Sequence, residues 1–476
     1  MCLRNLASVI PIRPAPSGPE DAGLFEVRRK IYPRAVHGVF ARWRWSLVWA
    51  TQLFFYGMPW LSWNGRPALL FDLGARKFYV LGFVFWPQDF IYLTLLLVIS
   101  ALSLFLFTAV AGRLWCGYAC PQTVYTEIFL WIERKTEGER SAREKLDREP
   151  MSVRKFVLKA AKHLSWGTLA FWTGFTFVGY FTPIRQLAME FVTTALGPWE
   201  AFWILFYAAA TYANAGFMRE QVCKYMCPYA RFQGAMFDRD TLVIAYDPLR
   251  GEPRGARSRQ SDPKALGLGD CIDCTLCVQV CPTGIDIRKG LQYECIGCAA
   301  CIDACDQVMD KVGYPKGLIR YATENAIARR AGLEGFLAHV ARPRTFIYAA
   351  ILGGVCVLAG TALFLRVPLK VDVIRDRGAL VREVEDGELE NVYRLQVMNA
   401  TEEAHRYRLK VEGVPGLRVA SDAEFVVEAA ATRGFPVRLR APRGALANGS
   451  HPIRISVDSF DTTAVNVTEK SVFIVR

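Results

Sequence analysis

Eight cysteines in two runs of equal spacing constrain this chain more than any other feature of its sequence. Both runs have the spacing C-x2-C-x2-C-x3-C, and the second begins fourteen residues after Cys281. The first run comprises Cys271, Cys274, Cys277 and Cys281, and the second comprises Cys295, Cys298, Cys301 and Cys305. Three thiolates separated by two residues each can wrap one face of a metal cluster, and the fourth sulfur must come from elsewhere. The segment 271–305 is therefore predicted to fold around metal.

The first run ends in Cys281-Pro282, the pattern of bacterial ferredoxins that hold two [4Fe-4S] clusters. In those proteins each fourth cysteine crosses to the other cluster. Carried onto this chain, the pattern assigns Cys271, Cys274, Cys277 and Cys305 to cluster one, and Cys281, Cys295, Cys298 and Cys301 to cluster two. Asp306 stands where the second run would have proline, which is expected to weaken the turn after Cys305 without removing a ligand. Zinc also accepts four thiolates, but two evenly spaced runs of four cysteines are not typical of zinc sites.

Two further cysteine pairs have the form C-x3-C-P. They are Cys116 and Cys120 before Pro121, and Cys223 and Cys227 before Pro228. An i, i+4 pair places both sulfurs on one helix face, and the proline tends to end the helix at the second cysteine. Soft thiolates select Cu(I), zinc or iron-sulfur iron, and a site that prefers Cu(I) also favours copper reduction. One pair alone would read as buried, inert thiols, whereas the repeated pattern favours a functional site.

The rest of the chain has the composition of a membrane protein. Its hydrophobic fraction of 52% and aromatic fraction of 13% exceed those of ordinary soluble domains. A bilayer-crossing helix needs about 20 mostly apolar residues, and Trp and Tyr are enriched at its ends. One such stretch could be the buried core helix of a soluble protein. Five such stretches with aromatic residues at their ends indicate membrane spans instead. The predicted spans are 45–63, 86–111, 164–182, 199–217 and 346–365.

The distribution of charge predicts how these spans are oriented. The net charge of +13 is not accompanied by a nucleic-acid-binding motif, so no nucleic-acid partner is expected. The connection 113–162 holds eleven Lys and Arg, whereas the loops 64–85 and 183–198 hold three and one. The connection, the N-terminus and the ferredoxin-like segment are therefore predicted to be cytoplasmic, where thiols stay reduced. Residues 1–42 lack the features of a cleaved signal peptide. Five spans then place the chain from about Arg366 outside, in the periplasm of a bacterial cell.

The C-terminal part changes to a period-two alternation that is typical of β-strands. The alternating residues are Tyr393, Leu395 and Val397, then Tyr407, Leu409 and Val411, then Phe435, Val437 and Leu439, then Ile453, Ile455 and Val457. Turn residues between these runs predict an all-β immunoglobulin-like sandwich over 371–476. It has no cysteine and nothing that looks catalytic, so docking to a partner, guarding an exit and a structural cap all stay open.

The predicted organisation is a polytopic α-helical membrane protein with an inserted ferredoxin-like domain and this β-sandwich. The segments are a cytoplasmic tail 1–44, a membrane domain 45–249, a basic linker 250–266 that hugs anionic lipid, a ferredoxin-like domain 267–315, a basic connector 316–345, the fifth span 346–365 and the sandwich 371–476. Four other residues carry no strong pattern. Cys2 is unassigned, Cys356 is expected to pack inertly, and His163 and Met226 could be ligands but read more simply as interfacial and packing residues.

This combination resembles the FixG/RdxA/CcoG family, the accessory proteins of cbb(3)-type cytochrome c oxidase. The likeness covers nearly the whole chain, from the spans and C-x3-C-P motifs to the two-cluster segment and the immunoglobulin-like tail. It implies an oxidoreductase of the bacterial cytoplasmic membrane, a cupric reductase that converts Cu(II) to Cu(I) for the copper centre of the oxidase. Copper would then react at or near Cys116, Cys120, Cys223 and Cys227. The implied partners are copper ions, a copper transporter or chaperone, oxidase assembly factors, membrane lipids and an unidentified cytoplasmic electron donor.

Two alternatives stay open. A quinol-linked membrane polyferredoxin, similar to membrane components of periplasmic nitrate or nitrous-oxide reductase systems, shares the C-x3-C-P and ferredoxin motifs. The immunoglobulin-like tail favours the first family, because the nitrate-type proteins usually stop after the clusters. A non-redox assembly scaffold, which holds clusters only for structure, is the alternative of another class.

Overall fold

The computed structural model describes residues 30–257, 266–329, 342–376, 381–384, 387–445, 447–460 and 465–475. The chain divides into two compact units, which are described separately. The first comprises residues 1–58, 95–179 and 184–356, and the second comprises 59–94, 180–183 and 357–476. Cys2, the tail to residue 29, residues 258–265 of the predicted linker and residues 330–341 of the predicted connector lie outside the described residues.

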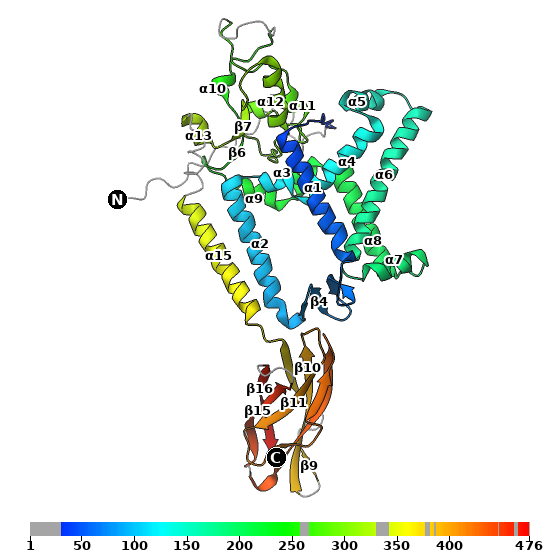
Figure 1. Ribbon diagram of the computed structural model, residues 1–476, viewed down its shortest axis with the longest axis vertical. Helices are drawn as coiled ribbons and strands as arrows, with labels where there is room; N and C mark the ends of the chain where they lie inside the picture. Colours follow the sequence, from blue (N-terminus) through cyan, green and yellow to red (C-terminus); the bar gives the residue numbers. More distant parts are fainter. Residues whose placement is uncertain are drawn as a thin grey trace, which may run out of the picture. The chain divides into compact units, whose positions relative to one another are not determined.

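All five predicted spans are helical over most of their length (Figure 1). The helices are α1 (Val39–Gly57), α2 (Phe90–Ala111), α6 (Val153–Val178), α8 (Pro198–Thr211), which continues as the π-helix η3 (Tyr212–Met218), and α15 (Pro343–Phe364). Within the described ranges, the segments long and apolar enough to cross a bilayer are Pro87–Ala111 and Pro343–Phe364. The number of five spans therefore stays a prediction.

Two of the predicted spans have different ends in the structure. The helix α1 stops at Gly57, and a short 3-10 helix η1 (Met58–Trp60) follows, so the last residues of the predicted first span are not helical. Pro59 explains this end, because proline has no backbone N–H to donate to the carbonyl four residues earlier. The helix α6 begins eleven residues before the predicted third span. The hydroxyl of Ser152 accepts a hydrogen bond from the backbone N–H of Lys155 at 3.2 Å and caps this start.

The other elements of the first unit are short and connect the long helices. They are α3 (Leu114–Tyr118), α4 (Pro121–Glu137), α5 (Arg140–Arg148), α7 (Ile184–Val192), the π-helix η4 (Val222–Met226), α9 (Pro228–Met236), β6 (Val243–Tyr246), α10 (Pro248–Gly251), α11 (Leu276–Gln279), η5 (Ile287–Lys289), α12 (Ala300–Val312), β7 (Ile319–Ala322) and α13 (Glu324–Arg329). The helices α4, α6 and α8 lie side by side (Figure 1), and the stacked rings of Phe129 and Trp166, 5.0 Å apart, lie in a core between α4 and α6.

The ferredoxin-like part extends beyond its predicted bounds of 267–315. The strands β6 and β7 form an antiparallel pair in which Tyr246 lies opposite Ile319, and both strands fall outside those bounds. The expected turn after Cys305 is absent, because Cys305 and Asp306 lie inside the helix α12. The Asp306 carboxylate accepts a hydrogen bond from the backbone N–H of Gly317 at 2.9 Å. A residue other than proline at position 306 thus lets the helix continue.

The second unit contains the predicted β-sandwich. One sheet has the order β12-β14-β10-β8, with β9 also paired to β10, and the other has the order β13-β11-β15-β16. The strands are β8 (Leu369–Arg375), β9 (Arg382–Glu383), β10 (Glu388–Asn399), β11 (His405–Glu412), β12 (Arg418–Val419), β13 (Glu424–Val427), β14 (Thr432–Pro442), β15 (Gly449–Ser459) and β16 (Asn466–Val475), with a 3-10 turn η7 (Arg443–Ala445). The twelve alternating apolar residues predicted from the sequence all lie in or against its core.

Residues 64–85, predicted only as a loop, form small antiparallel sheets in this second unit. The elements are β1 (Ser62–Trp63), β2 (Arg66–Pro67), β3 (Leu69–Asp72), β4 (Lys77–Val80), β5 (Phe83–Phe85) and η2 (Pro87–Asp89). Val84 and Trp86 pack with Met398 and Ala400 of the sandwich. The buried carboxylate of Asp89 forms an ion pair with Arg366 at 2.7 Å. The sandwich therefore has an additional base that the sequence analysis missed.

Candidate functional site

The two cysteine runs fold into loops with the same backbone pattern. In the first run Asp273 and Thr275 both have φ of 55°, and in the second Gly297 and Ala299 have φ of 71° and 59°. These residues flank the second cysteine of each run. Non-glycine residues rarely adopt positive φ, and those that do occur in tight turns and often at functional sites. The repeated conformation turns each loop tightly, as a loop that wraps a metal cluster requires.

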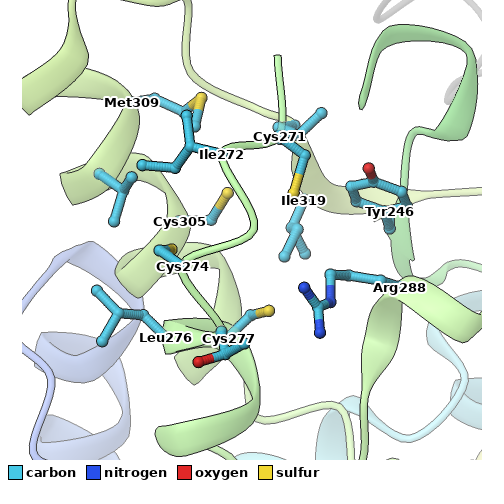
Figure 2. Close-up of a pocket in the computed structure, with 13 residues that line it drawn as sticks. Tyr246, Cys271, Ile272, Cys274, Leu276, Cys277, Arg288, Cys305, Met309 and Ile319 are labelled. Carbon is cyan, nitrogen blue, oxygen red and sulfur yellow. The ribbon is translucent and has the colours of Figure 1, made fainter. Parts of the chain in front are cut away.

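The first pocket gathers four cysteines from both runs. It is lined by Cys271, Cys274, Cys277 and Cys305 together with mostly apolar side chains (Figure 2). Arg288 from η5 and Tyr246 from β6 also lie at this pocket. The thiol of Cys274 is exposed, whereas Cys271 and Cys277 are buried. This pocket therefore has one face toward the surface.

The second pocket gathers the other four cysteines. It is lined by Cys281, Cys295, Cys298 and Cys301, and Cys277 lines both this pocket and the first. Most of its other lining residues are aliphatic. Burial raises the pKa of Cys295 to about 12, so a metal-free thiol here stays protonated. The two pockets divide the eight cysteines in the same crosswise way as the sequence assignment.

The donor set of each pocket fits a [4Fe-4S] cluster. Four sulfur donors converge on one space, and thiolates are the ligands that hold such clusters. The first pocket would use Cys271, Cys274, Cys277 and Cys305, and the second would use Cys281, Cys295, Cys298 and Cys301. The surrounding aliphatic side chains keep water away, which also affects the reduction potential of a bound cluster.

The C-x3-C-P motifs do not lie on single helix faces, and that part of the sequence prediction is wrong. Cys116 lies in α3, which ends at Tyr118, whereas Cys120 has an extended backbone and precedes the first residue of α4. Cys223 lies in the π-helix η4, and Cys227 likewise precedes the first residue of α9. The prolines after Cys120 and Cys227 break each helix before the second cysteine, and each then occupies the first position of a new helix.

The structure nevertheless brings the four cysteines of the two motifs together. Cys120 and Cys223 interact electrostatically, and each also interacts with Cys227. The side-chain N–H of Gln122 donates to the backbone oxygens of Asn214 and Arg219 at 3.0 and 3.1 Å, which fixes α4 to the segment before the second motif. Cys116, Cys120, Cys223 and Cys227 are hereafter called the thiol site.

Burial governs the acidity of the thiol site. Burial, together with the nearby thiol of Cys120, raises the pKa of Cys116 to about 12 and that of Cys223 to about 11. The carboxamide of Gln233, a fully buried residue of α9, lies 3.6 Å from the sulfur of Cys116. Metal must therefore displace protons when it binds these thiols.

The thiol site lies directly beside the second pocket. A Cβ added to Gly117 would come within 2.8 Å of the Cα and the N of Cys298, so the two backbones are in contact. Cys116 and Cys223 pack in the same cluster as Cys298 and Cys301. The hydroxyl of Tyr321 donates to the backbone oxygen of Gly297 at 2.7 Å and further holds this loop. The thiol site thus contacts the second pocket directly, through the backbone at Gly117 and through packed cysteine side chains.

Three other predicted candidates do not join these sites. The Nδ1 of His163 lies 2.8 Å from the hydroxyl of Tyr212, and its ring packs against Trp166. Met226 ends η4 with an exposed side chain, and Cys356 is exposed on α15 rather than packed. His163 is thus held by aromatic neighbours rather than at either site, whereas the expectation that Met226 and Cys356 pack is wrong, because both side chains are exposed.

The sequence analysis missed two arginines that hold the second cysteine loop. Arg44 of α1 donates to the backbone oxygen of Cys298, and Arg113 donates to that of Tyr293 at 2.5 Å. It also missed Asp303 of α12, whose buried carboxylate accepts hydrogen bonds from the first backbone N–H groups of α1, including that of Ala41 at 2.7 Å. These residues come from segments far apart in the sequence, so no local pattern marks them.

Comparisons with known proteins agree with this arrangement. Family models match residues 218–324 ("4Fe-4S dicluster domain"), 93–137 ("4Fe-4S binding domain") and 359–476 ("IG-like fold at C-terminal of FixG"). The prediction of iron-sulfur clusters and of an immunoglobulin-like domain is therefore confirmed.

Three relatives are similar over most of the chain. Protein RdxA of Cereibacter sphaeroides is 40% identical over 433 residues, which cover 88% of this chain and 91% of RdxA. Protein RdxB of the same organism is 41% identical over 400 residues, or 82% of this chain and 84% of RdxB. The nitrogen fixation protein FixG of Rhizobium meliloti is 39% identical over 433 residues, or 84% of this chain and 83% of FixG. A crystal structure of a FixG-related protein from Vibrio parahaemolyticus is 28% identical over 22% of this chain and 95% of its own, with a TM-score of 0.21.

Proposed function

Because the chain belongs to the FixG/RdxA/CcoG family, we propose that it is a membrane-bound electron-transfer protein that reduces Cu(II) to Cu(I) at the thiol site. The Cu(I) would serve the copper centre of a cbb(3)-type cytochrome c oxidase, and a copper transporter or chaperone would receive it. One observation carries the proposal. The backbone of Gly117, inside the first C-x3-C-P motif, touches that of Cys298, inside the second pocket.

The chemistry of the thiol site suits copper reduction. Each Cu(II) takes up one electron and becomes Cu(I), and a cytoplasmic one-electron donor replaces the electron that the protein loses. A [4Fe-4S] cluster in each pocket supplies reversible one-electron chemistry. The thiolates of Cys116, Cys120, Cys223 and Cys227 prefer Cu(I) as soft ligands, and this preference favours the reduced ion. Binding displaces their protons, and Gln233 orients the sulfur of Cys116.

We extend the proposal to five spans, with the clusters in the cytoplasm and the sandwich in the periplasm. Helices outside the two most apolar ones also carry large exposed apolar side chains. The helix α1 exposes Trp49, Leu53 and Phe54, and α8 exposes Trp199, Phe202 and Phe206. Such surfaces are unfavourable in water and suit lipid. The basic residues of the connection between α2 and α6 support a cytoplasmic location for the thiol site.

The test is a double substitution in the thiol site. Protein carrying Cys116→Ser and Cys223→Ser, purified and reduced without oxygen, is expected to lose reduction of Cu(II) while keeping the absorbance and EPR spectra of its clusters. Cys356→Ser is the matched control, because this cysteine is exposed on α15 and lines neither cluster pocket, and it should behave like the unmodified protein. Copper reduction at an unchanged rate in the double variant would disprove the role of the thiol site.

A second candidate uses the same four thiols for iron. The family model described as a 4Fe-4S binding domain covers Cys116 and Cys120, which line neither cluster pocket. In that case the double variant would lose iron and part of its EPR signal. Two other outcomes address the remaining alternatives. Oxidation of the reduced protein by a quinone with no response to copper would favour a quinol-linked polyferredoxin, and a scaffold would pass electrons to neither.

A further inference from the structure

Two arginines beside the second pocket are buried without a carboxylate partner. Arg44 is 7% exposed and Arg113 is 6% exposed. Neither forms an ion pair, within 4.0 Å, with any carboxylate in the part of the chain that the structure describes. A buried charge is unfavourable unless an opposite charge compensates it. We therefore expect each guanidinium to lie close to an anionic group that balances its charge.

Arg113 lies between the second pocket and the thiol site. Its guanidinium donates to the backbone oxygens of Tyr293 and Ala230 and packs on the ring of Tyr293, with 4.8 Å to the ring centre. Its own backbone oxygen would lie 3.0 Å from a Cβ at Gly297, so it touches the loop between Cys295 and Cys298. It also interacts electrostatically with Cys295 and with Cys116. The positive charge of Arg113 therefore acts on a cysteine of the second pocket and on a cysteine of the thiol site.

Arg44 approaches the same loop from α1. Its guanidinium donates to the backbone oxygen of Cys298 and interacts electrostatically with that cysteine. Two negative groups oppose it. Glu127 of α4 interacts with both Cys298 and Arg44, and Asp303 also interacts with Arg44, although the Asp303 carboxylate is engaged by the N-terminus of α1. Arg44 thus contacts a cysteine that lines the second pocket.

The first pocket has the opposite arrangement of charge. Its arginine, Arg288, forms two hydrogen bonds of 2.8 Å with the carboxylate of Asp286 and is also bonded to Asp273. Asp306 adds a further negative charge beside Cys305. The arginine at the first pocket is therefore paired directly with carboxylates, whereas Arg44 and Arg113 at the second pocket have no such direct ion pair among the described residues.

We propose that Arg44 and Arg113 are the counter-charges of the second pocket and give it a higher reduction potential than the first. A cluster gains one negative charge when it accepts an electron, and a nearby uncompensated cation stabilises that charge. The deeper burial of the second pocket acts in the opposite direction, but two cations in contact with its loop outweigh it because charges interact strongly where water is excluded.

The consequence is a direction for electron flow. The exposed Cys274 makes the first pocket accessible to a one-electron donor, and the second pocket touches the thiol site through Gly117. With clusters held by the cysteines of the two pockets, an electron delivered to the first cluster would be retained by the second, the first losing one electron as the second gains one. This inference depends on the iron-sulfur clusters and not on copper, so it can be tested with copper absent.

The experiment is an EPR-monitored redox titration of the purified protein without copper. Two midpoint potentials are expected. Arg44→Gln and Arg113→Gln should each lower the higher midpoint and leave the lower one unchanged. Glu127→Gln removes an opposing charge and should raise the higher midpoint. Arg239→Gln, at a half-exposed arginine paired with Glu324, is the control and should shift neither.

Variants that retain the charge separate electrostatics from misfolding. Arg44→Lys and Arg113→Lys should titrate close to the unmodified protein, and iron content reports whether each variant keeps its clusters. If both glutamine variants lose iron, the proposal is tested by Glu127→Gln alone. A rise of the higher midpoint potential in that variant supports it. Two equal midpoints in the unmodified protein, a shift of the lower midpoint in the arginine variants, or no rise in Glu127→Gln would overturn the proposal.

Discussion

At the scale of single residues, the thiol site requires glycine at position 117, where no side chain fits. Gly117→Ala would place a Cβ 2.8 Å from backbone atoms of Cys298, which cannot move like a flexible side chain. Overpacking of this kind costs about 1–3 kcal/mol. We expect a lower melting temperature and slower copper reduction, measured by thermal unfolding in detergent and by a Cu(I) chelator.

The matched control is Gly167→Ala in α6. A Cβ at Gly167 would meet nothing within 4 Å, so alanine should be neutral or stabilise the helix by up to about 1 kcal/mol. Equal effects of the two substitutions would contradict the importance of the contact between Gly117 and Cys298.

Sequence patterns predicted the cysteines of both sites but not the residues that support them. The spacing of the cysteines carries the chemistry directly, because one loop can supply only three ligands to a cluster. Arg44, Arg113 and Gln233 act from other segments, and each is an ordinary residue in its local sequence. Such residues become recognisable only when the fold brings the segments together.

At the scale of secondary-structure elements, a buried ionic network fixes the segment before the second C-x3-C-P motif. Glu133 of α4 pairs with Arg143 of α5 at 2.9 Å and with Arg219 at 2.7 Å, and all three residues are buried. Burial alone would raise the pKa of Glu133, but Arg219 and Arg143 lower it below its usual value. Removing one member of such a network leaves a buried charge without its partner.

Glu133→Gln should therefore destabilise the protein by about 3–5 kcal/mol near neutral pH. Because the pKa is lower in the folded state, the carboxylate contributes stability above its unfolded pKa, and this contribution is lost as pH falls through the folded pKa. The difference in melting temperature between variant and unmodified protein should then shrink in acid. Glu144→Gln, in a more exposed pair with Arg140, should cost at most about 1 kcal/mol. A pH-independent difference would contradict this account.

The junction between α1 and α12 offers a second prediction at this scale. Asp303 accepts hydrogen bonds from Phe40 and Ala41 at the start of α1, where a carboxylate also interacts favourably with the helix dipole. Asp303→Ala should cost about 0.5–2 kcal/mol and loosen the loop that Arg44 holds. Thermal unfolding and the cluster EPR spectrum measure both effects. Asp310→Ala, an exposed residue of the same helix paired with Lys316, should change neither.

The elements differ in how readily their sequences reveal them. The sandwich strands were predictable because Leu395, Val437 and Ile455 alternate with outward-facing residues over long strands. The strands between residues 62 and 85 are two to four residues long, too short to show a period. The helix break before Cys120 follows from Pro121, but the new helix that starts there separates the two cysteines of the motif, which a single-helix reading could not anticipate.

At the scale of the whole molecule, sequence predicted the order of the parts better than their bounds. The cluster-binding part recruits β6 and β7 from outside 267–315, because a loop that wraps metal still needs a sheet and an apolar layer to rest on. The sandwich likewise recruits Val84 and Trp86 from a segment more than 280 residues earlier. Non-local packing of this kind has no signature in either segment alone.

The proposed topology gives the last prediction. Ser141 in α5 and Asp422 in the sandwich are both exposed, so a cysteine at either position would react readily. If the connection 113–162 is cytoplasmic and the sandwich periplasmic, a membrane-impermeant maleimide added to spheroplasts should label Asp422→Cys at once and Ser141→Cys only after the membrane is opened. The unmodified chain gives the background from its own thiols. Opposite labelling requires an odd number of spans between the two positions, and the five predicted spans place three there. Labelling of both positions from the same side would instead indicate an even number of spans between them and would remove the basis for placing the sandwich and the thiol site on opposite sides.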